Sequence, residues 1–328
     1  MAPISPNGNA GDVQYGVAMW GAPGSGKTTF LGALNIALAR QGGAWRIVGK
    51  DPASTEMLTR LTTSLAAERS FPQGTQGIEH CHWVLMGNTH RVVRHGFLKM
   101  KKREHVAVSV NLDLVDPQGK LYSNDMSARD VVRGDLIHNL ENSRGIIFLF
   151  DPIREFRYGD GFEHTVGVLN DLAQRMSASR QLVGGRLPHY IAVCVTKFDE
   201  VRVLQTAEKL DLLITDPNDQ FGFPRVDDAY AGDLFAQLCQ VSQSGNADLM
   251  LNYLRQHFAP ERIGHFVTSA IGFHVDPLTN VYNPEDFQNH LPDPGKPGQM
   301  LIRGTVHPIN VVEPIMWLAR KMAAGPGR

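Results

Sequence analysis

Eight residues near the start of the chain have the spacing of a phosphate-binding loop. Residues 21–28 read Gly-Ala-Pro-Gly-Ser-Gly-Lys-Thr, which matches the pattern G-x-x-x-x-G-K-[ST]. Glycines let successive backbone N–H groups turn inward around phosphate oxygens, and a helix that begins there adds the positive end of its dipole. We expect phosphate contacts from Gly21, Ala22, Pro23, Gly24, Ser25, Gly26, Lys27, Thr28 and Thr29.

Two side chains of this loop have chemistry of their own. Lys27 would reach the β- and γ-phosphates and act in phosphoryl transfer, and the Thr28 hydroxyl would bind Mg²⁺. A chance glycine turn is the alternative. The neighbouring segments argue against it, because residues 15–20 are apolar as in a strand and residues 29–40 carry apolar residues at helical spacing.

A second motif, Asp116-Pro117-Gln118-Gly119, follows a stretch of strictly alternating apolar residues at 106–114, which predicts a strand. Asp116 could hold Mg²⁺ through water, opposite Thr28. The Gly119 N–H could meet the γ-phosphate and sense its presence. A strand-end Asp-Pro is often only a turn. Asp151 could compete for the metal, but Asp151-Pro152 favours the cap of a helix.

A third motif could read the base. Thr196-Lys197-Phe198-Asp199 follows the apolar run 190–195. The Asp199 carboxylate can accept two hydrogen bonds from guanine N1–H and the exocyclic amine, whereas adenine would leave a buried carboxylate unpaired. The Lys197 stem can lie over the base plane, and Thr196 opens the motif. A solvated Lys/Asp turn is the alternative.

Thr268-Ser269-Ala270 comes after the last predicted strand, at 265–268. The backbone of Ser269 and Ala270 could contact the guanine oxygen. The tripeptide alone is a weak signal. Its place after the other motifs is what makes it a candidate.

These motifs require elements that bring them together, and the chain predicts such elements. Apolar runs at 145–150 and 190–195 are typical of central parallel strands that are covered on both faces. Strands and helices alternate, so we predict an α/β fold: a three-layer P-loop NTPase sandwich with a mostly parallel, doubly wound sheet and an antiparallel strand before the D-x-x-G strand. Further helices are expected at 51–69, 165–179, 204–214, 231–241 and 309–322, and residues 273–308 should be mostly loop.

Composition excludes several classes of protein. The chain has 328 residues and a formal net charge of -1, which argues against a dedicated nucleic-acid binder. Its three cysteines form no C-x-x-C pair, and no apolar run is long enough to cross a bilayer. We expect a cytoplasmic protein. The expected organisation is a disordered tail at 1–12, one domain at 13–322 with a helical insertion at about 201–264 and a closing helix, and a tail at 323–328.

Taken together, the motifs resemble those of TRAFAC-class P-loop GTPases, over about residues 13–272. More narrowly, the chain resembles the bacterial double-GTPase group of conflict and signalling GTPases. The segments behind this are GAPGSGKTTFLGAL, WRIVGKDPASTEMLTRL, FPQGTQG, VDPQG, GIIFLFDP and TKFD. The resemblance implies GTP and GDP as ligands, Mg²⁺ as cofactor, hydrolysis of GTP to GDP and phosphate, and a switch that acts on a protein effector or a second GTPase subunit.

The resemblance also supplies a further metal ligand. GTPases of this class use a threonine in a mobile loop before the second strand to complete the Mg²⁺ shell, and Thr75 occupies that place. The alternative interpretation is that Thr75 is an ordinary threonine in a turn. Thr62 and Thr63 fit less well, because they lie in a helical pattern. The catalytic set implied is Lys27, Thr75 and Gly119, and the metal set is Thr28, Thr75 and Asp116.

One departure from the class concerns hydrolysis. The position just after D-x-x-G, where many such GTPases carry a water-orienting Gln or His, is Lys120 here. We therefore expect slow hydrolysis or a catalytic group from a partner. Arg69 and Arg129 flank the two loops and could act as a finger, although a surface role is favoured for each. A non-hydrolysing regulatory module stays open, as does, less favoured, an ATPase.

Two other features have structural and functional interpretations. His80-Cys81-His82 could belong to a metal site, but we favour a structural role. The basic stretch at 90–105 could touch an anionic partner, and we favour a solvated hairpin because apolar residues alternate through it.

Overall fold

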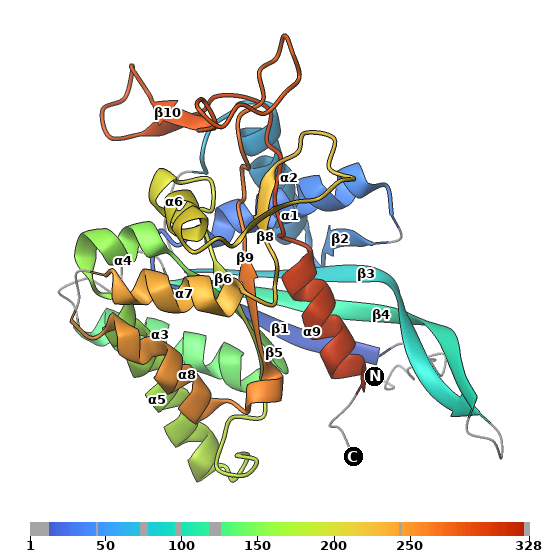
Figure 1. Cartoon of the computed structure of the whole chain (residues 1–328). Coiled ribbons are helices and arrows are strands. Elements are labelled where there is room, and N and C mark those ends of the chain that lie inside the picture. Colours follow the sequence, from blue (N-terminus) through green and yellow to red (C-terminus); the bar gives the residue numbers. More distant parts are fainter. Residues whose placement is uncertain are drawn as a thin grey trace.

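A seven-stranded sheet runs through the middle of the molecule (Figure 1). The computed structural model describes residues 13–43, 45–72, 78–95, 100–117, 126–242 and 245–324. The strands of the sheet are β1 Val13–Gly21, β2 Arg46–Gly49, β3 Ile78–His95, β4 Met100–Pro117, β5 Gly145–Phe150, β6 Tyr190–Val195 and β9 Ile263–Val267. Their order across the sheet is β2-β3-β4-β1-β5-β6-β9.

Strand direction follows the predicted pattern. β1 pairs in parallel with β4 on one side and β5 on the other, and β5, β6 and β9 continue the parallel part. β3 runs antiparallel to both β2 and β4. The prediction of a mostly parallel sheet with an antiparallel strand before the D-x-x-G strand is therefore confirmed.

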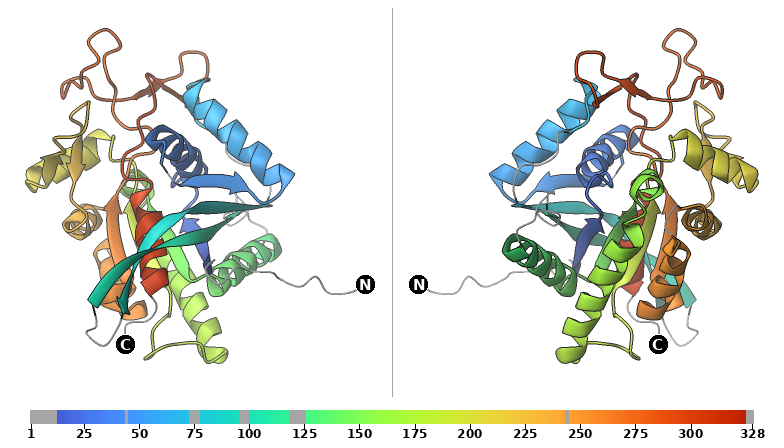
Figure 2. Two further views of the ribbon diagram at one scale, coloured as in Figure 1. Left: turned by 90° about the vertical axis from the view of Figure 1, so that its right-hand side faces the viewer. Right: turned by 90° about the vertical axis from the view of Figure 1, so that its left-hand side faces the viewer.

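Helices cover both faces of the sheet and complete the three layers. They are α1 Lys27–Gln41, α2 Pro52–Ala66, α3 Met126–Asn142, α4 Pro152–Tyr158, α5 Gly161–Ala178, α6 Val201–Lys209, α7 Ala231–Gln240, α8 Met250–His257 and α9 Glu313–Ala324. One apolar core joins the sheet to α3, α5, α6, α7 and α8. The other joins it to α1, α2 and α9. Figure 2 shows the two layers of helices from the sides.

Boundaries differ from the expectations where local turns override the apolar pattern. The helix expected at 204–214 is wrong beyond Lys209, because Asp211 has a φ of 55° that a right-handed helix does not allow. The chain instead enters a small antiparallel pair, β7 Leu213–Thr215 and β8 Pro224–Val226. The closing helix starts at Glu313 rather than 309, because Ile309 pairs with Ser269.

One long hairpin belongs to the seven-stranded sheet, and a short one forms a small sheet of its own. β3 and β4 pair from Ile78–Pro117 to His95–Met100, which confirms the hairpin expected around residues 90–105. This ribbon projects beyond the helical layers (Figure 1). In the loop-rich region 273–308, β10 His290–Pro292 and β11 Met300–Ile302 form a short antiparallel pair at the top of the molecule in Figures 1 and 2.

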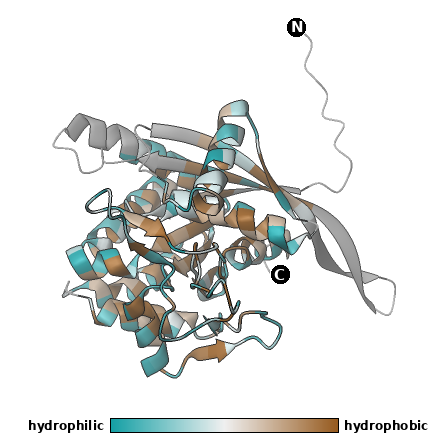
Figure 3. Ribbon diagram, turned by 90° about the horizontal axis from the view of Figure 1, so that it is seen from above, coloured by the Kyte–Doolittle hydropathy of each residue, from teal (hydrophilic) through white to brown (hydrophobic). Residues whose placement is uncertain are grey.

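Apolar residues gather in the inner elements when the molecule is viewed from above, and hydrophilic residues are frequent on the outer helices and loops (Figure 3). In the part of the chain that the structure describes, no helix has both the length and the apolar character that a bilayer span requires.

Cys81 is buried against Met57, whereas His82 lies 2.6 Å from Asp113 Oδ1, so these two neighbours have separate structural partners.

Buried histidines make stability depend on pH. Burial lowers the pKa of His164, His189, His265 and His307 to about 4. The folded chain keeps these rings neutral while the unfolded chain binds protons below about pH 6.5. We therefore predict that the free energy of unfolding falls from pH 7 to pH 5, by about 2 kcal/mol for each of the most buried two, His164 and His189.

Urea unfolding at the two pH values measures this effect. His189→Asn should remove part of the pH dependence, whereas His138→Gln, at an exposed position of α3, should leave it unchanged. Equal unfolding free energies of the unchanged chain at pH 7 and pH 5 would contradict the prediction.

Candidate functional site

The parallel strands bring the sequence motifs to one edge of the sheet. β1 ends at Gly21 in the glycine-rich loop, β6 ends one residue before Thr196, and β9 ends one residue before Thr268. Gly21 lies opposite Leu149, and Val195 lies between Phe150 and Val267 in the register. The carboxyl edge of a parallel sheet is where ligands of such folds bind.

A cavity of about 1000 Å³ lies at this edge, large enough for a nucleotide. The glycine-rich loop and the start of α1 contribute Gly24, Ser25, Gly26, Thr29 and Phe30 to its lining. The two later motifs contribute Thr196, Lys197, Asp199, Thr268 and Ala270. Part of the predicted phosphate-binding set and part of the predicted base-reading set thus line one cavity. The remaining predicted residues of these two sets do not line it: Gly21, Ala22, Pro23, Lys27, Thr28 and Ser269.

The glycine-rich loop has the conformation that its sequence predicts. Gly24 and Gly26 have φ angles of 75° and 92°, which favour glycine, and α1 begins at Lys27 directly after them. Pro23 belongs to the same turn, and Thr28 is the second residue of α1. The loop therefore presents backbone N–H groups and the N-terminus of a 15-residue helix to the cavity.

Lys27 is held beneath this loop. Its Nζ donates to the carbonyl oxygens of Gly21 and Ala22, at 3.1 and 3.3 Å, and its side chain is buried. A neighbouring His164 accepts a hydrogen bond from Trp20 Nε1 at 3.4 Å. Burial and the charge of Lys27 lower the pKa of His164 to about 4. The buried lysine is thus a cation at the base of the glycine-rich loop, beside a neutral imidazole.

Asp199 is a buried carboxylate at the other end. Ser269 Oγ donates to Asp199 Oδ1 at 2.5 Å and accepts from the Gly272 N–H at 2.8 Å. Burial raises the pKa of Asp199, and the hydrogen bond from Ser269 and the nearby His290 lower it. The hydrogen bond links the motif that ends at Asp199 to the Thr268-Ser269-Ala270 segment, with Ser269 behind the carboxylate rather than on the cavity lining.

Lys197 has a second carboxylate partner. Its Nζ lies 2.6 Å from Asp151 Oδ2, and its φ of 59° is unusual for a residue other than glycine. Asp151 Oδ1 accepts from the N–H groups of Ile153 and Arg154, at 3.0 Å each, and so caps α4. The interpretation of Asp151 as a helix cap is confirmed, and its ion pair with Lys197 was not expected from the sequence.

Several predicted residues lie outside what the structure describes. Thr75, Gly119 and Lys120 are among them, and of Asp116 only the backbone position at the end of β4 is described. Of the predicted magnesium ligands, Thr28 is placed beside the cavity, at the second position of α1. The metal roles of Thr28, Asp116 and Thr75 all stay predictions.

Sequence reasoning missed one wall of the cavity. Phe71 and Pro72 come from the segment after α2, and His290, Pro292 and Met300 come from the β10–β11 hairpin. No spacing signal marks them, because three-residue strands are too short to show a period and the segments meet only through the fold.

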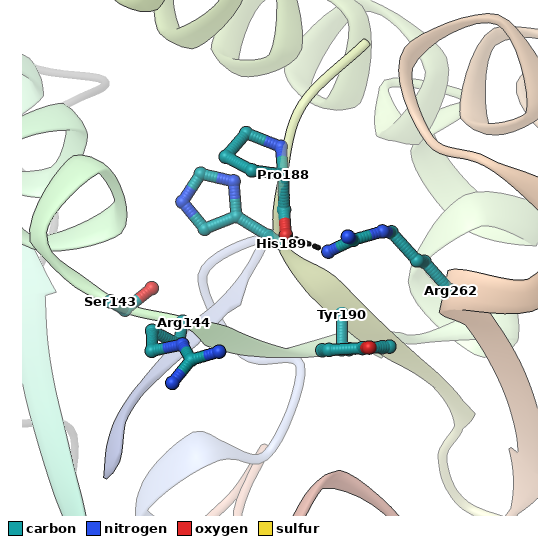
Figure 4. Close-up of a pocket in the computed structure, with 6 residues that line it drawn as sticks. All are labelled: Ser143, Arg144, Pro188, His189, Tyr190 and Arg262. Atoms are coloured by element: carbon teal, nitrogen blue, oxygen red, sulfur yellow. Dashed lines mark hydrogen bonds between the residues drawn. The ribbon is translucent and has the colours of Figure 1, made fainter. Parts of the chain in front are cut away.

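A second cavity, of about 250 Å³, lies at the opposite edge, where β5 and β6 begin (Figure 4). It is lined by Ser143, Arg144, Pro188, His189, Tyr190 and Arg262. The Arg262 guanidinium donates to the Pro188 carbonyl and lies 4.7 Å from the centre of the Tyr190 ring. None of the motif residues lines this cavity, so the larger cavity is the candidate site.

No family model and no curated protein sequence matches this chain. Among solved structures, it is similar to sup35 complexed with GDP (TM-score 0.30, 12% identity), covering 79% of this chain and 38% of that one. It is also similar to a single-residue variant of Aquifex aeolicus Era bound to GDP·AlF4⁻, with a TM-score of 0.29 and 13% identity, covering 78% of this chain and 51% of that one. Similarity to sup35 complexed with GMPPNP is at the same level, with a TM-score of 0.28 and 12% identity, covering 81% of this chain and 41% of that one.

The chain spans about half or less of the length of these structures. At these TM-scores the likeness adds nothing to what the residues of the cavity indicate.

Gly21 is the tightest position of the loop. A methyl group there would lie 2.6 Å from the Leu149 carbonyl oxygen and 2.6 Å from Ser25 Oγ. We predict that Gly21→Ala displaces the loop, lowers the free energy of unfolding by about 2 kcal/mol and weakens nucleotide binding. Gly43→Ala is the matched control, because nothing lies within 4 Å of the added methyl group. Thermal unfolding and nucleotide titration of both variants test this. Equal stability and equal nucleotide affinity of the two variants would contradict the prediction.

Proposed function

We propose that the chain binds GTP and GDP with Mg²⁺, hydrolyses GTP slowly to GDP and phosphate, and acts as a switch for a protein effector or a second GTPase subunit. The observation that supports this most directly is the single cavity that has the glycine-rich loop at one end and buried Asp199 at the other. We further propose the domain organisation expected from the sequence and a cytoplasmic location.

Base selection follows from the chemistry of Asp199. An ionised carboxylate accepts hydrogen bonds and donates none, so it suits the adjacent N–H and NH₂ groups of guanine. Adenine has no such pair of donors, and its binding would leave a desolvated carboxylate without partners. In this proposal Lys197 lies along the base plane, Thr196 positions that segment through its hydrogen bond to the Phe150 carbonyl at 3.0 Å, and Ala270 meets the guanine oxygen.

At the phosphate end, the loop N–H groups and Lys27 would balance the charge of the phosphates. On nucleotide binding, Lys27 would exchange its two loop carbonyl partners for phosphate oxygens. Thr28, Asp116 and Thr75 would hold Mg²⁺, which neutralises charge on the phosphates when bound. Gly119 would sense the γ-phosphate, and its loop would change with hydrolysis.

Affinities of the unchanged chain for GDP, IDP and ADP test base reading directly. IDP lacks the exocyclic amine, so it can donate only one hydrogen bond to Asp199. We predict a Kd for IDP about tenfold weaker than for GDP, and a Kd for ADP at least about 100-fold weaker. Isothermal titration with Mg²⁺ present measures all three. Equal affinities for GDP and ADP would contradict the guanine assignment and favour an ATPase.

Hydrolysis is tested separately in single-turnover reactions with GTP. Slow turnover that Lys27→Ala reduces about 100-fold or more supports the catalytic assignment. Binding of GTP with no turnover in the unchanged chain contradicts it, and would favour the non-hydrolysing module that Lys120 suggests.

A further inference from the structure

The β10–β11 hairpin forms an outer wall of the large cavity, apart from the four sequence motifs. His290 pairs with Ile302 and Pro292 with Met300 across the two strands. Residues paired in this way share a face of the ribbon, and their neighbours in sequence lie on the other. His290, Pro292 and Met300 line the cavity, whereas Leu291 and Leu301 do not. The alternation of the strands therefore places these three residues on one face together with Ile302, which is buried in an apolar cluster.

The hairpin is held firmly in this position. Asn289, which is fully buried, donates to the carbonyl oxygens of Ile271 and Thr305 at 3.1 Å each and accepts from the Gly304 N–H at 2.8 Å. Ile302 is buried in an apolar cluster with Ile36 of α1 and Leu65 of α2. The wall is thus attached to the helix that follows the glycine-rich loop and to the segment that follows Ser269.

A second attachment joins the hairpin to the segment after α2. The Ile302 N–H donates to the Arg69 carbonyl at 2.8 Å, and Ser70 pairs with Leu301. Phe71 and Pro72, directly after this bridge, line the cavity beside the hairpin. The two segments together give the cavity an apolar outer side.

The hairpin borders the base end of the cavity. His290 acts electrostatically on Asp199, and its Nε2 lies 3.5 Å from Glu200 Oε1. At the tip, the Met300 side chain is 37% exposed, so a ligand can contact it without rearrangement of the fold. An apolar side chain at this place suits the flat faces of a purine and a ribose and offers nothing to phosphate oxygens.

We infer that the inner face of this hairpin, through Met300 and Pro292, packs on the base and ribose of the bound nucleotide and strengthens its binding. This rests on the proposed function, since it takes the ligand of the cavity to be a guanine nucleotide. The hairpin is an affinity-determining element in addition to the P-loop and the motif of Asp199. Contact of this kind acts mainly on the rate of nucleotide release.

The chain offers a matched pair of variants for the test. Met300 and Leu291 belong to the same hairpin and are 37% and 38% exposed, but only Met300 lines the cavity. Met300→Ser should weaken GDP binding about fivefold to tenfold, because serine buries much less apolar surface against the nucleoside. Leu291→Ser should stay within about twofold of the unchanged chain, and Met300→Leu, which keeps the apolar volume, should restore most of the affinity.

Isothermal titration with GDP and with pyrophosphate measures the effect and locates it. Pyrophosphate has no base or ribose, so its Kd should be the same for Met300→Ser and the unchanged chain. The inference is overturned if Met300→Ser and Leu291→Ser bind GDP equally well. It is also overturned if Met300→Ser weakens pyrophosphate binding as much as GDP binding, because the hairpin would then act through the loop.

Failure of the proposed function gives a different result. If the unchanged chain binds ADP as well as GDP, the guanine assignment fails while the contact of Met300 with a nucleoside is still measured by ADP. If Met300→Ser then weakens binding of both GDP and ADP but not of pyrophosphate, the contact of the hairpin with the nucleoside is supported and the guanine assignment is not.

Discussion

A hydrogen bond between two buried side chains, Ser269 and Asp199, is the interaction on which the Asp199 end of the cavity depends. A carboxylate with 4% of its surface exposed is costly to ionise, which is why burial raises its pKa. The hydroxyl donor offsets part of this cost and fixes the direction of the carboxylate. Because the Gly272 N–H in turn donates to Ser269, the segment after β9 is shaped around this one group.

The sheet makes this arrangement possible. β6 and β9 are parallel neighbours, so their carboxyl ends deliver Asp199 and Ser269 to adjacent positions. β1 lies two strands away from β6, with β5 between them, which sets the distance between the glycine-rich loop and Asp199. Completely buried strands such as β5 and β6 keep these spacings rigid. The β10–β11 hairpin is held at the cavity in a similar way, through the buried hydrogen bonds of the Asn289 side chain at its base.

How much of this the sequence could predict depends on the range of the interactions. β5 and β6 begin and end where predicted, because continuous apolar runs of six residues have sharp boundaries. Apolar spacing predicts a helix to residue 214, but α6 ends at Lys209, because the spacing continues past the left-handed turn at Asp211. The ion pair of Lys197 with Asp151 and the wall formed by β10–β11 could not be predicted, because they join segments that are distant in the chain. The roles of Thr75, Gly119 and the Asp116 side chain remain predictions.

In the proposed function Asp199 reads guanine by accepting two hydrogen bonds, and an exchange of donors and acceptors tests this role most directly. Xanthine keeps the N1–H but carries a carbonyl in place of the amine, so it suits an amide that both accepts and donates. We predict that Asp199→Asn binds XDP more tightly than GDP, while the unchanged chain has the opposite preference, each by about tenfold or more. Isothermal titration of both proteins with both nucleotides gives the four affinities. Loss of binding to both by Asp199→Asn, with its fold and pyrophosphate binding intact, or an unchanged preference for GDP, would contradict the claim.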